Sequence, residues 1–338
     1  MTAAHAVSPS DEGRHPPTDE DLWNESYYCD FVDTAGAGTP GESGPALGGW
    51  LRLGLYPNRK VAWWTTWIVR PGLPGVCSVD YHAPVPPGDG LVSASERLGR
   101  VEIDLRDPLV AFRLAADAAA ELIATPESVY DAAASPGSSA TTPGATPTRL
   151  GVDLTWTTDG VPYHYDVTTR YEIPCLVSGT VTVGEETYTV RGHGQRDHSW
   201  GVRDWWAFGW CWCSLRLDDG TRVHLAHIRV PGFPAFFGYV QTPGAVHPAT
   251  ALDVTEDVGE HGFPTRARID IEAAPAHSLG IDVTPVAFGP VLLRNEDDGR
   301  TSRFPRAMVR CRADDGREGS GWIEWNQPEP ATPPDAAH

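Results

Sequence analysis

Residues 208–230 read Phe208-Gly-Trp-Cys-Trp-Cys-Ser-Leu-Arg-Leu-Asp-Asp-Gly-Thr-Arg-Val-His-Leu-Ala-His-Ile-Arg-Val230, two apolar runs on either side of one turn. In the first run, alternation places the side chains of Phe208, Trp210 and Trp212 on one face of an extended chain. The dipeptide Asp219-Gly220 is a strong signal for a two-residue hairpin turn. The stretch therefore predicts a β-hairpin with one aromatic face.

The rest of the chain repeats short β-prone runs between glycine- and proline-rich turns, with almost no helical periodicity. One exception is the alanine-rich run 115–124, for which we expect a turn or two of helix. An all-β fold follows, and broad runs of aromatics that face one way are typical of barrels that enclose a ligand cavity. The other predicted strands are 49–56, 61–69, 76–81, 100–105, 110–114, 150–156, 163–168, 170–183, 187–191, 267–271, 279–283, 306–311 and 319–328.

Three segments have the composition of irregular chain. Residues 1–20 are polar and charged with few apolar anchors, so we expect them to be disordered. Residues 132–148 are a low-complexity run of Ala, Ser, Thr, Pro and Gly, which predicts a mobile surface insertion. The end of the chain, 329–338, is expected to be a loose tail.

Length and charge narrow the classes of function. The 338 residues suffice for two domains of ordinary size, and the formal net charge of −19 argues against a nucleic-acid partner. The N-terminus has no apolar run typical of a signal peptide, and no segment is apolar for long enough to span a membrane. The six cysteines are scattered, and with no export signal we expect reduced thiols and a cytoplasmic protein.

A second stretch, directly before the hairpin, carries the candidate site: Gly192-His-Gly-Gln-Arg-Asp-His-Ser-Trp-Gly-Val-Arg-Asp-Trp-Trp206. Five of the thirteen tryptophans lie between Trp200 and Trp212, with the pair Arg196-Asp197 shortly before them and the pair Arg203-Asp204 among them. Charged groups among large aromatics must be paired or hydrogen-bonded, and a carboxylate there has reason for a shifted pKa. This pattern predicts a polar site at the bottom of an aromatic pocket.

In the functional interpretation, burial keeps Asp197 protonated so that it donates a proton to an uncharged substrate, while His198 orients it or shuttles protons. The faces of Trp200, Trp205 and Trp210 would stabilise a developing cation. Neighbours on a strand point to opposite faces, so both groups reach one cavity only if a bulge or turn intervenes, which the nearby glycines permit. The alternative interpretation is a buried Arg–Asp–His network that ties two barrels together.

Other chemistries fit the sequence less well. Ser199 lacks the glycine two residues before it that a nucleophile elbow requires, and the glycines at 192 and 194 lack the third glycine of a dinucleotide-binding loop. Two histidine pairs could ligate a metal, but their odd separations send the side chains to opposite faces of a strand; these pairs are His193 with His198 and His224 with His227. We therefore expect no metal and no cofactor.

Three segments carry a resemblance to a known family: Arg170-Tyr-Glu-Ile-Pro-Cys, the stretch 192–206, and Gly321-Trp-Ile-Glu-Trp325. They resemble a group of bacterial proteins related to the AttH-like and carotenoid 1,2-hydratase (hydroxyneurosporene synthase) superfamily. The hydratase motif contains an Asp-His-Asn-Trp-Gly-like segment, which Asp197, His198, Trp200 and Gly201 match, with Ser199 in place of Asn. The resemblance covers the second half of the chain well and the first half weakly.

The resemblance implies two lipocalin-like antiparallel β-barrels in tandem, which we place at residues 21–165 and 166–328 with the motif near their junction. It also implies a cofactor-free hydratase or cyclase that protonates an alkene of a hydrophobic, isoprenoid- or terpenoid-like small molecule. The alternative is a non-catalytic carrier of a hydrophobic ligand. The expected catalytic residues are Asp197 and His198, and the expected substrate-binding residues are Trp200, Trp205, Trp210, Trp212, Arg196, Arg203, Asp204, Tyr171 and Glu172. The substrate and the oligomeric state stay open.

Overall fold

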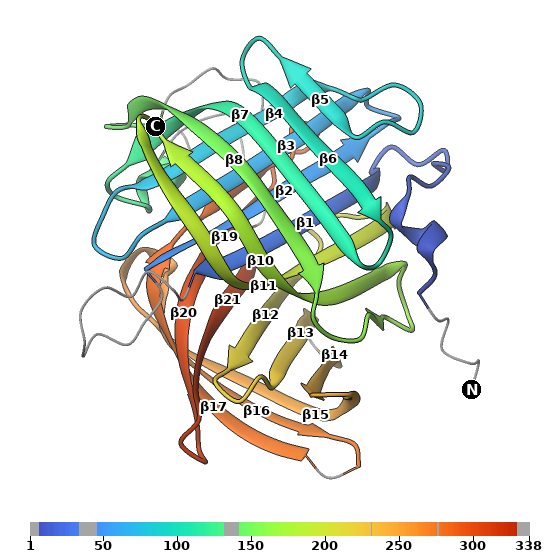
Figure 1. The fold of residues 1–338 in the computed structure, drawn as a ribbon, viewed down its shortest axis with the longest axis vertical. Coiled ribbons are helices and arrows are strands. Elements are labelled where there is room, and N and C mark those ends of the chain that lie inside the picture. The colour runs from blue at the N-terminus through green and yellow to red at the C-terminus, as the bar shows by residue number, and fades with distance from the viewer. Residues whose placement is uncertain (1–6, 34–45, 132–141, 231, 276, 330–338) are drawn as a thin grey trace.

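The computed structural model describes residues 7–33, 46–131, 142–230, 232–275 and 277–329. β-Strands dominate these ranges and form two large antiparallel sheets, which occupy the upper and lower halves of Figure 1. One sheet contains a closed eight-stranded barrel and the other a barrel-like ring. The predicted all-β fold of two tandem barrels is confirmed.

The first barrel is built from the N-terminal part of the chain. Its strand order is β4-β3-β2-β1-β11-β10-β8-β7-β6-β5, with β9 paired to β10, and pairing of β4 with β7 closes the ring. The strands are β1 Trp23–Asp33, β2 Leu47–Tyr56, β3 Val61–Val69, β4 Gly75–Pro84, β5 Val92–Ser95, β6 Gly99–Asp107, β7 Ala111–Ile123, β8 Thr146–Thr158, β9 Tyr163–His164, β10 Arg170–Val183 and β11 Glu186–Val202.

The second barrel has the order β12-β13-β14-β15-β16-β17-β20-β21-β19-β18, and pairing of β12 with β21 closes it. The predicted hairpin of residues 208–230 is its first strand pair, β12 with β13. The strands are β12 Gly209–Leu217, β13 Arg222–Val230, β14 Phe233–Thr242, β15 Ala245–Val258, β16 Pro264–Ala273, β17 His277–Phe288, β18 Val291–Arg294, β19 Thr301–Phe304, β20 Arg306–Ala313 and β21 Glu318–Glu329.

The helices are short: η1 Pro9–Glu12, α1 Ser128–Asp131 and η2 Glu260–Gly262. In the described part of the chain, no helix is long and apolar enough to cross a membrane. The expected disorder of residues 1–20 is wrong from residue 7 onward, whereas residues 1–6 lie outside the described ranges. The carboxylate of Glu12 is buried and accepts a hydrogen bond from Arg196 at 2.6 Å, which ties this segment to the first barrel.

Four other features differ from expectation. Because β10 and β11 pair with β8 and β1, the first sheet extends to Val202 rather than ending at residue 165. Of the expected insertion 132–148, residues 132–141 lie outside the described ranges, but residues 146–148 begin β8 and pair with β7. The alanine-rich run 115–124 forms strand up to Ile123 because its alternate residues are buried in the barrel, and tertiary pairing overrides helix propensity. Of the expected loose tail, Glu329 ends β21 and residues 330–338 lie outside the described ranges.

The buried apolar side chains form three clusters. Two of them fill the interiors of the barrels, with residues such as Leu154 and Trp156 in the first and Leu225 and Ile269 in the second. The third cluster lies where the outer faces of the barrels meet, and we call it the interbarrel interface. It comprises Tyr28, Val32, Trp50, Tyr56, Trp63, Trp67, Val69, Ile123, Tyr165, Trp205, Trp206, Trp212, Ala226, Val291, Leu293, Phe304, Met308 and Trp322.

Candidate active site between the barrels

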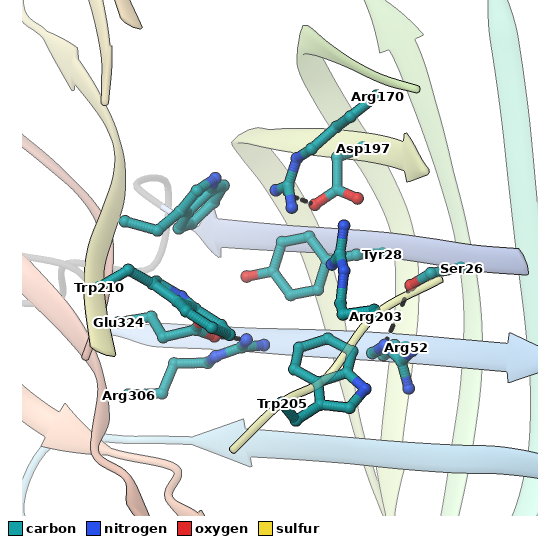
Figure 2. Close-up of a pocket in the computed structure, with 11 residues that line it drawn as sticks. Ser26, Tyr28, Arg52, Arg170, Asp197, Arg203, Trp205, Trp210, Arg306 and Glu324 are labelled. Atoms are coloured by element: carbon teal, nitrogen blue, oxygen red, sulfur yellow. Dashed lines mark hydrogen bonds and ion pairs between the residues drawn. The ribbon is translucent and has the colours of Figure 1, made fainter. Parts of the chain in front are cut away.

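A polar pocket opens within the interbarrel interface, and we call it the interface pocket (Figure 2). Both barrels and the connection between β11 and β12 supply its lining. It combines four arginines, two carboxylates, three tryptophans, a tyrosine and a serine: Ser26, Tyr28, Arg52, Arg170, Asp197, Arg203, Trp205, Trp210, Trp212, Arg306 and Glu324. The predicted polar site in aromatic surroundings therefore exists, and it lies between the barrels rather than inside either one.

Strand register brings the first barrel's side chains together on its outer face. Asp197 on β11 pairs with Tyr28 on β1 and with Glu172 on β10, and Tyr28 also pairs with Arg52 on β2. Directly paired residues on antiparallel strands point to the same side of the sheet. One row of residues across four strands thus faces the second barrel, and Arg170 joins it from two residues before Glu172.

Among the described residues, Asp197 is the only aspartate that lines the pocket, and its side chain is buried. Burial raises its pKa to about 6, against the lowering effect of the nearby guanidinium of Arg170 and with a further rise from Glu172. Arg170 donates a hydrogen bond to Asp197 Oδ2 at 2.7 Å and a second, from Nε, to Glu172 Oε1 at 2.8 Å. The pKa of the Asp197 carboxyl group therefore lies near neutral pH, and Arg170 holds one of its oxygens in place.

Two other arginines of the pocket have neutral partners. Arg52 donates from Nε to Ser26 Oγ at 3.0 Å, and Arg203 donates from Nη2 to Ser199 Oγ at 3.2 Å. Both guanidiniums lie over the ring of Trp205, at 4.8 and 5.0 Å from its centroid. Burial and the neighbouring cations lower the pKa of Arg203 to about 10, which still leaves it charged at neutral pH.

The second barrel contributes the opposite wall. Glu324 on β21 forms an ion pair with Arg306 on β20, its strand neighbour, and accepts a hydrogen bond from Trp210 Nε1 at 2.8 Å. The guanidinium of Arg306 lies over Trp50, 4.1 Å from the ring centroid. Among the described residues, Nε and Nη1 of Arg306 have no hydrogen-bond partner although they are buried.

Glu172 connects the pocket to a buried polar network behind it. It is fully buried and accepts hydrogen bonds from Gln195 Nε2 at 2.7 Å and from Trp212 Nε1 at 3.2 Å. The ring of His224 accepts from the hydroxyl of Tyr165 at 2.7 Å, which agrees with a neutral imidazole because burial lowers the pKa of His224 to about 3. These bonds join the two barrels, but their members differ from the Arg–Asp–His network that the sequence suggested as an alternative.

The other predicted site residues lie elsewhere. His198 and Arg196 alternate with Asp197 on β11, and they contact Tyr171 and Glu12 on the first barrel's side of the sheet. No register shift interrupts β11 at this point, so the bulge needed to unite Asp197 with His198 is not formed. Trp200 stacks on His15 at 3.7 Å, and Asp204 accepts hydrogen bonds from Arg300 at 3.2 Å.

Of the predicted residues, the structure thus gathers Asp197, Arg203, Trp205, Trp210 and Trp212 in the pocket, with Glu172 directly behind. Sequence reasoning missed Ser26, Tyr28, Arg52, Arg170, Arg306 and Glu324. A usable signal was a charged residue within an otherwise apolar strand. Arg52 lies within the apolar residues 50–55, and Glu324 lies between Trp322 and Trp325.

A cluster of three residues outside the interface pocket could hold a metal ion, because their ligand atoms all lie within 4.8 Å of one another. These are His15, Glu25 and His198. The same atoms are joined by hydrogen bonds, since Glu25 Oε1 lies 2.8 Å from His15 Nδ1 and 2.7 Å from His198 Nε2. The expectation of no metal stays a prediction, and this cluster does not belong to the interface pocket.

Fold and site together define a two-barrel protein with an arginine-rich, aromatic-walled pocket between the barrels. The chain belongs to the family described as a domain of unknown function, DUF7064, whose model matches residues 8–329. A search of curated proteins finds no matching sequence.

Solved structures share the fold at low sequence identity. A protein described as an AttH from Nitrosomonas europaea has 14% identity and a TM-score of 0.59, with 95% of this chain and 97% of that chain covered. Kievitone hydratase from Nectria haematococca has 11% identity and a TM-score of 0.58, with 97% and 94% covered. CghA with Sch210972 has 11% identity and a TM-score of 0.53, with 92% and 89% covered. The AttH-like resemblance is confirmed at the level of the fold.

Proposed function

We propose that this protein is a cofactor-independent hydratase or cyclase that protonates an alkene of a hydrophobic, terpenoid-like small molecule in the interface pocket. The observation that carries the proposal is the buried carboxyl group of Asp197, which shares a pocket with Trp205, Trp210 and Trp212. A pKa of about 6 is suited to a general acid, because an effective acid has a pKa near the working pH. The fold shared with kievitone hydratase gives independent support.

In the proposed reaction, Asp197 donates one proton and recovers one proton in each turnover. The alkene π pair takes the carboxyl proton of Asp197, a C–H bond forms, and the neighbouring carbon becomes electron-deficient. In hydration, a solvent water attacks that carbon and its surplus proton returns to Asp197; in cyclisation, a second alkene attacks and Asp197 recovers a proton from carbon. Arg170 holds one carboxylate oxygen at 2.7 Å throughout, and the tryptophan faces favour developing positive charge.

The second candidate is a non-catalytic carrier, and one contact favours it. The ion pair between Arg170 and Asp197 is the geometry of a structural link, and a permanently ionised Asp197 would donate no proton. In that case the tryptophans would serve only to bind the apolar body of a ligand. The enzyme transfers a proton from Asp197 to the ligand, whereas the carrier does not. One substitution at Asp197 therefore distinguishes the two functions.

The test is Asp197→Asn, which keeps the shape of the side chain and removes the acid. We expect turnover to fall by about 10²–10⁴-fold, the usual contribution of general acid catalysis, while ligand affinity changes little. Turnover is measured in deuterated water as deuterium incorporated at carbon across a panel of unsaturated terpenoids.

Asp30→Asn is the matched control. Asp30 is also a buried carboxyl with a raised pKa, about 8 because of burial, but it does not line the pocket. We expect its turnover per folded molecule to match that of the unsubstituted protein. If Asp197→Asn keeps full turnover per folded molecule, or if no panel member gains deuterium, the enzyme proposal is wrong and the carrier is supported.

The proposal places the reaction in the cytoplasm. All six cysteines are free thiols, and five of them are buried. Reduced thiols are the usual state in a reducing compartment. Tracking a tagged chain by fractionation of its host checks this part of the proposal, and recovery from the exported fraction would contradict it.

A further inference from the structure

The interface pocket carries more positive than negative charge. Four arginines line it, whereas Asp197 and Glu324 are its only carboxylates among the described residues. Counting Glu172, which binds Arg170 from behind, still leaves the cations in excess by one. Asp30 does not offset them, because burial raises its pKa to about 8 and keeps it mainly protonated at neutral pH.

This excess is local, because the chain as a whole has a formal net charge of −19. Like charges that cluster in a partly buried site destabilise the folded state, and such clusters are found chiefly where a group of opposite charge binds. Arg52 and Arg203 carry the excess. Each donates to a serine hydroxyl, and neither has a carboxylate within ion-pair distance among the described residues.

The two guanidiniums also converge. Both lie over the ring of Trp205, at 4.8 and 5.0 Å from its centroid, and Figure 2 shows them on the same side of the pocket as that ring. Both line the same pocket as Asp197, and their positive charges act to lower the pKa of its carboxyl group. Arg306 adds two buried donors, Nε and Nη1, that have no hydrogen-bond partner among the described residues. Fork-shaped donors of this kind match a carboxylate or a similar planar oxyanion.

We infer that the interface pocket binds the anionic group of its substrate through Arg52 and Arg203, so that the substrate is a lipophilic acid with an alkene rather than a neutral hydrocarbon. The inference rests on the proposed function only for the identity of the pocket as the substrate site. The tryptophan walls hold the apolar body, and the guanidiniums fix its polar end. A bound anion also offsets the cationic surroundings, which would otherwise oppose the positive charge that alkene protonation creates.

The test compares two ligands of nearly the same shape, one anionic and one neutral: geranic acid, an unsaturated terpenoid carboxylic acid, and its primary amide. Binding is followed by quenching of tryptophan fluorescence, with Arg203→Gln, Arg52→Gln and the unsubstituted protein. Arg100→Gln is the control, because it removes the same charge from an exposed ion pair with Glu102 outside the pocket.

We expect the unsubstituted protein and Arg100→Gln to bind the acid at least about tenfold more tightly than the amide, the scale of a hydrogen bond to a charged group. Each pocket variant should reduce this preference to a few-fold. If Arg203→Gln does not fold, as thermal melting will show, Arg52→Gln decides. Equal binding of acid and amide, no binding of the acid at millimolar concentration, or a preference that survives both pocket substitutions would overturn the inference.

The binding test is independent of turnover. A charge preference that depends on the two arginines, together with full activity of Asp197→Asn, would sink the proposed reaction and leave the acid-binding site standing. Conversely, turnover of a neutral alkene that requires Asp197, without any preference for the acid, would refute the lipophilic-acid substrate and leave the hydratase or cyclase in place.

Discussion

The interiors of the two barrels and the interface between them differ in what fills them. Apolar side chains such as Leu154 and Leu225 dominate the interiors, and the first barrel adds the buried pair of Arg196 with Glu12. The interface combines large aromatics with ion pairs, buried carboxyls and the polar pocket. A lipocalin-like barrel suggests a ligand inside the barrel, but here a row of polar side chains on the outer face of the first barrel meets Arg306 and Glu324 of the second barrel.

The two faces of β11 therefore have different roles in this protein. Positions on one face of β11 build the first barrel's interior, and positions on the other face build a site shared with the second barrel. Asp197 and His198 are neighbours in sequence, yet they serve these two different regions. The comparison therefore predicts that substitutions in the two regions have separable effects on stability and on ligand binding.

The largest expected effect is at the ion pair in the interface. Glu324→Gln leaves the buried cation of Arg306 without its partner, and breaking such a pair costs about 3–5 kcal/mol of unfolding free energy. Asp282→Asn in the exposed pair with Arg266 is the control and should cost about 0–1 kcal/mol. Urea unfolding measures both, and equal losses would contradict the burial difference.

Next in size are truncations inside the barrels. Leu154→Ala in the first and Leu225→Ala in the second should each cost about 2–5 kcal/mol of unfolding free energy, because they leave cavities among packed side chains. Ligand affinity per folded molecule should stay unchanged. Trp210→Leu in the pocket should weaken ligand binding instead. A ligand whose affinity follows the interior substitutions would place its site inside a barrel.

The sequence predicted part of the interface pocket and missed lining residues on both barrels. The hairpin and the residues Asp197, Trp205 and Trp212 could be predicted because they lie in one stretch, 192–230, and the all-β fold could be predicted from short β-prone runs along the whole chain. Arg306 and Glu324 lie more than ninety residues after Trp212 and reach the pocket through β20 and β21. Alternation reveals which residues share a face, but it does not reveal whether that face lines an interior or a neighbouring barrel.

The same limit explains the separated pair of Asp197 and His198. The glycines around the motif permit a bulge, but the regular pairing of β11 with β1 and β10 prevents one. The position of the sheet boundary was also unreadable, because β10 and β11 pair with strands that come earlier in the chain. Such long-range pairing has no local signal.

The pH dependence of turnover should follow Asp197. Burial raises its pKa to about 6 in the folded protein, above the ~3.9 of an unfolded aspartate. The protonated form is the acid, so kcat/KM should be level below about pH 6 and fall about tenfold per pH unit above it. By the same shift, this group's contribution to stability is present below ~3.9 and is lost as the pH rises through about 6.

A pH–rate profile of kcat/KM over pH 4–9, roughly the range that brackets this pKa, checks the prediction. Asp197→Asn should remove the descending limb along with most of the rate. A rate that instead increases through the same range would assign the ionised carboxylate as a base.

The smallest expected effect is a displacement of Arg52 without loss of its charge. A Cβ atom at Gly54 would lie 2.5 Å from Arg52 Nη1, so Gly54→Ala should push the guanidinium from its place. Forcing a side chain off its rotamer costs about 0.5–1.5 kcal/mol, so affinity for geranic acid should fall roughly two- to tenfold. Gly13→Ala, whose Cβ would meet nothing closer than 3.7 Å, is the control. Unchanged affinity in the fluorescence titration would show that the position of Arg52 is not critical.

The central claim is that the ligand occupies the space between the barrels, and labelling with a diazirine derivative of geranic acid tests it most directly. After irradiation and digestion, mass spectrometry identifies the labelled residues. We predict labels on the pocket's own segments, around Arg52, from Asp197 to Trp212, and near Glu324. Labels concentrated on interior residues such as Leu154 or Leu225 would contradict the claim.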